Sequence, residues 1–507
     1  MSRLSFAPVF GDGMVLQRDK ELTIWGKASG DGPVRVYLGD YRSESSVVNG
    51  NWKCSFPPMD ATTGLTLLAK QGGEVIRIQN IMIGDVWLAG GQSNMEFFLR
   101  YEAHFEEARA LPNNSMIRMY TCPRIAFEGQ KPYQSGCGYW FGQEDSAWET
   151  FSSAAYWFAR ELQPELDIPL GIIACNWGGT SASAWVPANS LRDSELEVYL
   201  SDYEAAIAGK DLEENKQLSM RGWAFQEDPV HMREWAGVMY GIDRQAQLER
   251  LVKRANNPAI PMGPYNKNRP GCLYEQMITP IQNCAIKGVL WYQGENDVHH
   301  ALLYSKLFET LIYKWRKIWG QDIPFIFAQL APFGEWLALD GRLFPEIRRQ
   351  QELVSKTVPN CYMISTSDVG MYYDIHPKEK KTLGHRYFLQ AMDKVYEKPC
   401  LSDAPVIDKG HIKDDCIILE FQNSGCGLKV QGNPDALFEV YQGESRVKPK
   451  DICLSKNKAV LCFGQPITAP VKIEFAQSPY YEVNIFNSAG LPALPACMTL
   501  EVAHDFC

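Results

Sequence analysis

The sequence predicts an α/β protein in which a mostly parallel sheet, flanked by helices, lies between β-sandwich-like N- and C-terminal regions. From about residue 83 to 398, strand-like apolar runs alternate with segments of helical period, which is the pattern of βαβ units. Residues 1–82 and 399–507 instead hold short runs of β-forming residues separated by Gly, Pro and Asn. We therefore expect three domains: β-rich residues 1–82, a central domain over 83–398, and β-rich residues 399–507.

The elements follow in chain order. The N-terminal region should form strands at 22–25 and 34–38. The central region should form a strand at 86–89, a helix at 148–162, strands at 169–174 and 286–292, a helix at 303–315, a strand at 323–328, a helix at 346–357, a strand at 361–366 and a helix at 378–396. Residues 200–275 are polar with few clean periods, so we expect an insertion over or beside the sheet. The C-terminal region should add strands at 417–421, 472–475 and 481–486.

Length and composition narrow the class of protein. The 507 residues suit about three domains, and 45% hydrophobic with 22% charged residues is ordinary globular usage. No apolar run approaches the ~18 residues of a spanning helix, so we expect no membrane partner. The net charge of −10 counts against nucleic acid as a partner. Aromatic residues make up 12% of the chain, either as core or as stacking platforms for a ring-shaped ligand.

The 14 cysteines show no metal or redox motif, because the closest two are nine residues apart. We expect mostly buried thiols, with a few bridges allowed in the C-terminal third. The N-terminus lacks the apolar segment of a signal peptide. The expected location is therefore periplasmic or secreted if a signal peptide was removed, and otherwise cytoplasmic.

Two polar segments follow the first expected strands of the central sheet, at the strand ends where α/β proteins bind ligands. In Gly-Gly-Gln-Ser-Asn-Met-Glu, residues 90–96, Ser93 would stand at a tight strand-to-helix turn, as a nucleophile or as a helix cap. In Asn-Trp-Gly-Gly-Thr-Ser, residues 176–181, the consecutive Gly178 and Gly179 would let backbone N–H groups approach a ligand oxygen, or form an ordinary turn.

Two further segments follow later strands. After 286–292, Asn296 could donate to an oxyanion and Glu295 could support a histidine, although Asn296 or Asp297 could instead simply cap the next helix. In Asp-Ile-His-Pro, His376 could act as general base, with Asp374 fixing its tautomer. Each segment alone is a weak signal. Together, on one sheet, they supply a nucleophile, oxyanion donors and a base.

These blocks resemble the sialate O-acetylesterase family of the SGNH hydrolase superfamily. The matching motifs are Gly-Gln-Ser-Asn-Met at 91–95, Trp-Gly-Gly-Thr at 177–180, Trp-Tyr-Gln-Gly-Glu at 291–295 and Asp-x-His-Pro at 374–377. The resemblance implies an SGNH-hydrolase-like central domain that removes O-acetyl groups, typically at the 9-position, from sialic acid or a sialoglycan. It implies no cofactor and no metal.

The resemblance also implies roles for single residues. Ser93 would be the nucleophile and His376 the base, with Asp374 or Glu295 as the acid. The acid is open because the superfamily's usual position, three residues before the histidine, is Tyr373 here. The oxyanion hole would take N–H groups of Ser93 and of Gly178 or Gly179, together with the side chain of Asn296. The remaining motif residues expected to bind substrate are Gln92, Trp177 and Gln293.

Two other functions fit the same sequence. The first is an acetylesterase that acts on a plant polysaccharide such as acetylxylan, since the same blocks serve that chemistry. The second is a non-catalytic carbohydrate-binding protein that uses its β-rich regions and aromatic residues. The sequence leaves the oligomeric state open.

Overall fold

The computed structural model describes residues 4–29, 32–132, 136–226, 228–241, 259–319, 323–336, 339–432 and 437–501. The chain divides into two compact units. The first unit comprises residues 1–326, 357–361 and 378–388, and the second comprises residues 327–356, 362–377 and 389–507. Sheets and helices occur together, which confirms the mixed α/β class. The three domain boundaries drawn from the sequence remain a prediction.

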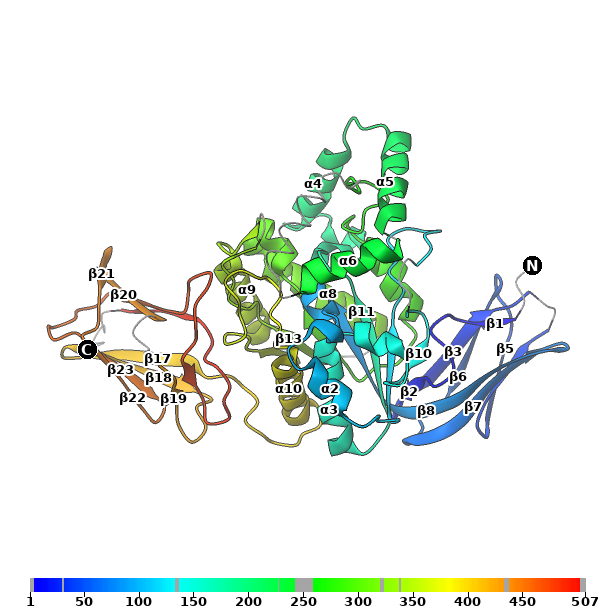
Figure 1. Ribbon diagram of the computed structural model, residues 1–507, viewed down its shortest axis with the longest axis horizontal. Coiled ribbons are helices and arrows are strands. Elements are labelled where there is room, and N and C mark those ends of the chain that lie inside the picture. The colour runs from blue at the N-terminus through cyan, green and yellow to red at the C-terminus, as the bar shows by residue number, and fades with distance from the viewer. Residues whose placement is uncertain are drawn as a thin grey trace. The chain divides into compact units, whose positions relative to one another are not determined.

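One long strand, β8 (Glu74–Gly91), organises the first unit (Figure 1). Its first part pairs antiparallel with β7 (Thr62–Gln71). Its last part pairs parallel with β11 (Leu170–Asn176) and β12 (Gly288–Tyr292). The strand predicted at 86–89 is therefore the end of an 18-residue strand. That end alone stood out in the sequence because all residues from 81 to 91 are buried, whereas the earlier part of β8 is largely exposed.

The central sheet of the first unit has the strand order β10-β9-β11-β8-β12. Strand β9 (Ile117–Thr121) pairs parallel with β11, and β10 (Trp140–Phe141) pairs antiparallel with β9. Two further strands, β13 (Phe325–Ala328) and β16 (Cys361–Ile364), contain residues of both units. The parallel pairs place the carboxyl ends of β8, β11 and β12 at one edge, where the motif segments begin.

The N-terminal region of the first unit contains the strands expected at 22–25 and 34–38. An antiparallel sheet joins β1 (Ser5–Phe6), β3 (Leu22–Lys27) and β6 (Asn51–Phe56). A second group extends from β8: β2 (Val15–Gln17) pairs with β8 itself, and β4 (Val34–Leu38) pairs with β7 and with β5 (Tyr41–Ser45).

The helices of the first unit are α1 (Ser93–Glu96), α2 (Phe105–Ala110), α3 (Ser153–Leu166), α4 (Glu197–Ile207), α5 (Leu212–Gln226), α6 (Pro229–Tyr240), α8 (Tyr304–Trp319) and α10 (Lys380–Gln390), whose last residues belong to the second unit. The helix predicted at 148–162 begins later, at 153, because Ser152 caps α3 by accepting the N–H of Ala155. No described helix has the length and apolar character needed to cross a membrane.

The expected insertion at 200–275 contains most of α4, together with α5 and α6, and its residues 242–258 lie outside the described part of the chain. Helix α6 packs against the segment that follows α1. The ring of Tyr240 lies 4.9 Å from that of Phe97 and 5.2 Å from that of Phe98. The described insertion therefore contacts the chain just after the first motif.

The second unit contains helix α9 (Phe344–Thr357), whose last residue belongs to the first unit, and a β-rich C-terminal part. One antiparallel sheet has the order β17-β18-β23-β22, with β17 (Val406–Lys413), β18 (Cys416–Gln422), β23 (Lys458–Cys462) and β22 (Asp451–Ser455). The other has the order β21-β20-β24-β26, with β21 (Ser445–Val447), β20 (Phe438–Gln442), β24 (Val471–Phe475) and β26 (Ala496–Leu500). A single hydrophobic cluster takes buried residues from both sheets, as in a sandwich.

Shorter strands complete the second unit: β14 (Glu335–Trp336) with β15 (Leu339–Asp340), and β19 (Lys429–Val430) with β25 (Ile485–Phe486). The strand predicted at 481–486 is wrong except for its last two residues. Tyr481 is held by tertiary contacts instead. Its hydroxyl lies 2.9 Å from Ser367 Oγ, and the Arg348 guanidinium lies 5.2 Å from its ring centroid.

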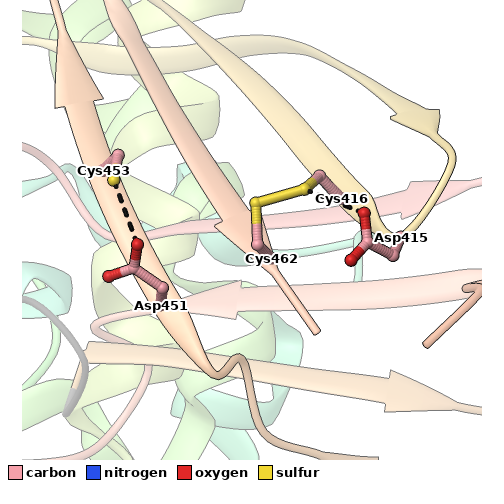
Figure 2. Close-up of a disulfide and its surroundings, with 5 residues drawn as sticks. All are labelled: Asp415, Cys416, Asp451, Cys453 and Cys462. Atoms are coloured by element: carbon pink, nitrogen blue, oxygen red, sulfur yellow. Dashed lines mark hydrogen bonds between the residues drawn. A yellow bond between two sulfur atoms is a disulfide. The ribbon is translucent and has the colours of Figure 1, made fainter. Parts of the chain in front are cut away.

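A disulfide joins Cys416 on β18 to Cys462 on β23, two residues in direct register (Figure 2). It falls in the C-terminal third, where the sequence allowed a bridge. The expectation of buried thiols holds for Cys54, Cys122, Cys175, Cys272 and Cys361. It is wrong for Cys400, Cys426, Cys453 and Cys497, which are exposed. Alternation explains Cys453 and Cys497, because on β22 and β26 they take the exposed positions between inward-facing neighbours.

Candidate active site

The first motif forms a tight turn between β8 and α1. Gly91 has a φ of +130°, and a Cβ atom there would lie 2.1 Å from the carbonyl oxygen of Tyr292. Only glycine therefore allows the end of β8 to approach β12 this closely. Gln92 donates its N–H to the same oxygen at 3.0 Å, and Ser93 then begins α1. The turn thus places Ser93 at the carboxyl end of the central strand.

The second motif lies directly against this serine. A Cβ atom on Gly178 would lie 3.2 Å from Ser93 Cβ, so glycine is the residue that fits. The N–H of Gly178 donates to Glu96 Oε2. The N–H of Gly179, by contrast, donates to no acceptor among the described residues. Of the two glycines expected to bind an oxyanion, Gly179 is the one whose N–H is not used inside the described fold.

A buried ion pair joins the first two motifs. Arg124 Nη1 lies 3.1 Å from Glu96 Oε1, and both side chains are only 2% exposed. Arg124 Nε also donates to the carbonyl oxygen of Asn176 at 3.1 Å. The pair therefore holds α1 against the end of β11. Sequence reasoning missed Glu96, although its position three residues after Ser93 places it on the same helical turn.

The third motif places the carboxylate of Glu295 in contact with α1. Glu295 is 7% exposed and accepts a hydrogen bond from Asn94 Nδ2. Lys380, which is fully buried, donates to Asn94 Oδ1 at 2.6 Å. Burial raises the pKa of Glu295, and the Asn94 hydrogen bond and the Lys380 charge act in the opposite direction. Glu295 Oε2 is buried and has no hydrogen-bond partner in the described part of the chain.

Asp297 connects the third motif to the second. Its carboxylate accepts hydrogen bonds from Ser181 Oγ at 2.6 Å and from the N–H of Ala182 at 2.9 Å. Burial raises the pKa of Asp297, and these hydrogen bonds lower it. Gln293 is fully buried and donates from Nε2 to Asp297 and to the carbonyl oxygen of Thr180. These contacts give Gln293 a role inside the fold, and its binding of substrate remains a prediction.

The other predicted binding residues lie around the same turn. Asn296 is exposed; its N–H donates to Gln92 Oε1 at 3.3 Å and its Nδ2 lies 3.5 Å from Asn268 Oδ1. Gln92 and Trp177 are each 3% exposed, and Trp177 packs against Trp223 with ring centroids 5.6 Å apart. The first unit therefore brings together the residues of the first three motifs.

The second unit carries the fourth motif. His376 is 1% exposed, and the edge of its ring packs against Trp336 with centroids 5.2 Å apart. Asp374 Oδ1 accepts the N–H of His376 at 2.8 Å and lies 3.5 Å from its Nδ1. Tyr373, which occupies the superfamily's usual acid position, is 48% exposed. Within this unit, the carboxylate beside the histidine is therefore that of Asp374.

Comparison with known proteins identifies relatives of this chain. Residues 250–393 match the family described as carbohydrate esterase, sialic acid-specific acetylesterase. The sialate O-acetylesterase of Rattus norvegicus is 25% identical, and the match covers 86% of this chain and 81% of the rat protein. That of Homo sapiens is also 25% identical, with 80% and 73% covered. A carbohydrate acetylesterase from Xanthomonas citri shares the fold, with a TM-score of 0.75, 24% identity and coverage of 97% and 99%.

These findings agree with the motifs. The family match spans the third and fourth motifs, and the curated relatives match most of the chain. The resemblance to sialate O-acetylesterases drawn from four short motifs is thereby confirmed. Residues 250–393 therefore match a family of sialic acid-specific carbohydrate esterases, and most of the chain is similar to sialate O-acetylesterases.

Proposed function

We propose that this protein hydrolyses O-acetyl esters of sialic acid, with the 9-O-acetyl ester as preferred substrate, through an acetyl-serine intermediate on Ser93. The observation that carries the proposal is the turn after β8. It places Ser93 against a glycine pair in which the Gly179 N–H has no acceptor among the described residues. A nucleophile beside an unused backbone donor is the arrangement that acyl transfer requires.

The reaction follows from these roles. His376 accepts the Oγ proton of Ser93 as Oγ attacks the acetyl carbonyl carbon. The N–H groups of Ser93 and Gly179, together with the Asn296 side chain, bind the negative charge that develops on the carbonyl oxygen. The C–O bond to the sugar then breaks, and the sugar hydroxyl leaves with the proton from His376. Water, deprotonated by His376, hydrolyses the acetyl-serine and releases acetate.

Asp374 is the acid that we assign to His376. Its Oδ1 lies 3.5 Å from Nδ1 of the histidine, and its hydrogen bond from the His376 N–H fixes its orientation. A carboxylate there would hold the tautomer that leaves Nε2 ready to accept a proton. Glu295 would instead stabilise α1, the helix that begins at Ser93, because its Oε1 accepts a hydrogen bond from Asn94 on that helix.

Three variants test the proposal by acetate release from 9-O-acetyl-N-acetylneuraminic acid. Ser93→Ala should abolish turnover while the circular dichroism spectrum stays that of the wild type. Asp374→Asn should lower kcat by about 10⁴-fold, as the loss of a triad acid does. Glu295→Gln should lower kcat much less. Turnover by Ser93→Ala would rule out the nucleophile, and a larger loss in Glu295→Gln than in Asp374→Asn would make Glu295 the acid.

A further inference from the structure

Two consecutive residues, Lys267 and Asn268, bind the two carbonyl oxygens of the glycine pair beside Ser93. Lys267 Nζ donates to the carbonyl oxygen of Gly178 at 2.6 Å. Asn268 Nδ2 donates to the carbonyl oxygen of Gly179 at 2.9 Å. Neither residue belongs to the motifs that identify the family, and both lie about 90 positions along the chain from the glycines.

The carbonyl held by Lys267 belongs to the same peptide group as the N–H of Gly179. A peptide group is planar with its C=O and N–H pointing in opposite directions, so fixing the carbonyl of Gly178 also fixes the direction of the Gly179 N–H. A cation on the carbonyl oxygen also polarises the group and strengthens its N–H as a donor. This matters because Gly179 has a φ of +66°, a conformation that glycine can also leave easily.

The segment that carries the two residues is itself held in place. Asn268 Oδ1 accepts the N–H of Ser181 at 2.9 Å, and the N–H of Asn268 donates to Asn266 Oδ1 at 2.8 Å. Asn266 Nδ2 in turn donates to the carbonyl oxygens of Ile260 and Pro261. The Lys267 ammonium also lies 5.5 Å from the Trp177 ring centroid, within the range of a cation–π contact. These contacts leave the two side chains little freedom to move away from the glycines.

We propose that Lys267 and Asn268 are positioning residues that aim the Gly179 N–H at the oxyanion of the transition state. The proposal rests on the proposed function, because it assigns the Gly179 N–H to the oxyanion formed when Ser93 attacks. The two side chains act through the backbone, so their loss should weaken transition-state binding while substrate binding stays the same.

The test measures kcat and KM for Lys267→Met, Lys267→Arg and Asn268→Ala on two substrates, 9-O-acetyl-N-acetylneuraminic acid and its C1 methyl ester. Lys267→Met and Asn268→Ala should each lower kcat by about 10- to 100-fold on both substrates, less than the loss of a whole oxyanion donor, with KM within 2-fold. Lys267→Arg should recover most of kcat. Lys317 is exposed on α8, and Lys317→Met is the control for the loss of a positive charge. Its kcat and KM should match those of the wild type.

A second measurement distinguishes a failure of the positioning role of Lys267 from a failure of the proposed function. A boronic acid that forms a tetrahedral adduct with the serine should inhibit the wild type, and its Ki should rise in Lys267→Met by the same factor by which kcat falls. No inhibition of the wild type would count against the serine mechanism itself. Equal Ki in both proteins would overturn the positioning role. A loss confined to the substrate with a free carboxylate would also overturn it and make Lys267 a contact for that carboxylate.

Discussion

The ion pair between Arg124 and Glu96 should be the most sensitive contact around the turn that holds Ser93. Replacing Arg124 by methionine leaves the Glu96 carboxylate buried without its cation, since both side chains are 2% exposed and 3.1 Å apart. Removing one partner of a buried pair costs about 3–5 kcal/mol. Glu96 keeps its hydrogen bond from the Gly178 N–H, so we expect the lower end, about 3 kcal/mol.

Unfolding in urea is monitored by tryptophan fluorescence, and esterase activity is measured over the same range of urea concentration. Glu96→Gln and the double variant Arg124→Met/Glu96→Gln complete a double-mutant cycle. The free energy of unfolding of the double variant, which lacks both charges, should be about 2 kcal/mol higher than that of Arg124→Met alone. Arg109→Met is the matched control, because Arg109 pairs with Glu106 at the surface, where such pairs contribute about 0–1 kcal/mol. An Arg124→Met effect no larger than that of Arg109→Met, or strictly additive single variants, would refute the reasoning.

Three further predictions concern other parts of the molecule. Gly178→Ala should lower kcat about 10- to 100-fold, because its Cβ would press on Ser93 Cβ at 3.2 Å; Gly73→Ala, which meets no atom within 4 Å, should match the wild type. Burial raises the pKa of Glu295, so the wild type should lose stability as pH rises above the ordinary value of 4.5. Glu295→Gln should lack this loss. A difference in Tm between the wild type and Glu295→Gln that does not vary with pH would contradict the prediction. Cys462→Ser should destabilise the β-rich part of the second unit by up to about 4 kcal/mol, given a sequence separation of 46 between the bridged cysteines, and a Tm equal to that of the wild type would contradict a formed bridge.

Local pattern was enough to find the strands that carry the motifs. Strands β11 and β12 lie within a few residues of their predicted positions, because a fully buried parallel strand is a continuous apolar run. The start of β8 escaped prediction because Arg77, Gln79 and Asn80 interrupt its apolar residues with exposed polar ones. The resemblance to sialate O-acetylesterases was found for a different reason, since the four motifs are specific in their combination.

The distinction between Gly178 and Gly179 could not be made from the sequence. The two residues are chemically identical, and what separates them is that Glu96 accepts the N–H of Gly178. Lys380 shows the same limit. It lies four residues after His376, yet its ammonium binds Asn94, 286 positions away in the chain. Such pairings depend on the tertiary fold, and no periodicity or spacing in the sequence indicates them.

Acetate release from 9-O-acetyl-N-acetylneuraminic acid and from acetylated xylan, measured side by side with the wild-type protein, tests the central claim most directly. The proposed function predicts a kcat/KM on the sialic acid ester well above that on xylan, and no release from either by Ser93→Ala. An equal or greater rate on xylan would contradict the assignment to sialic acid.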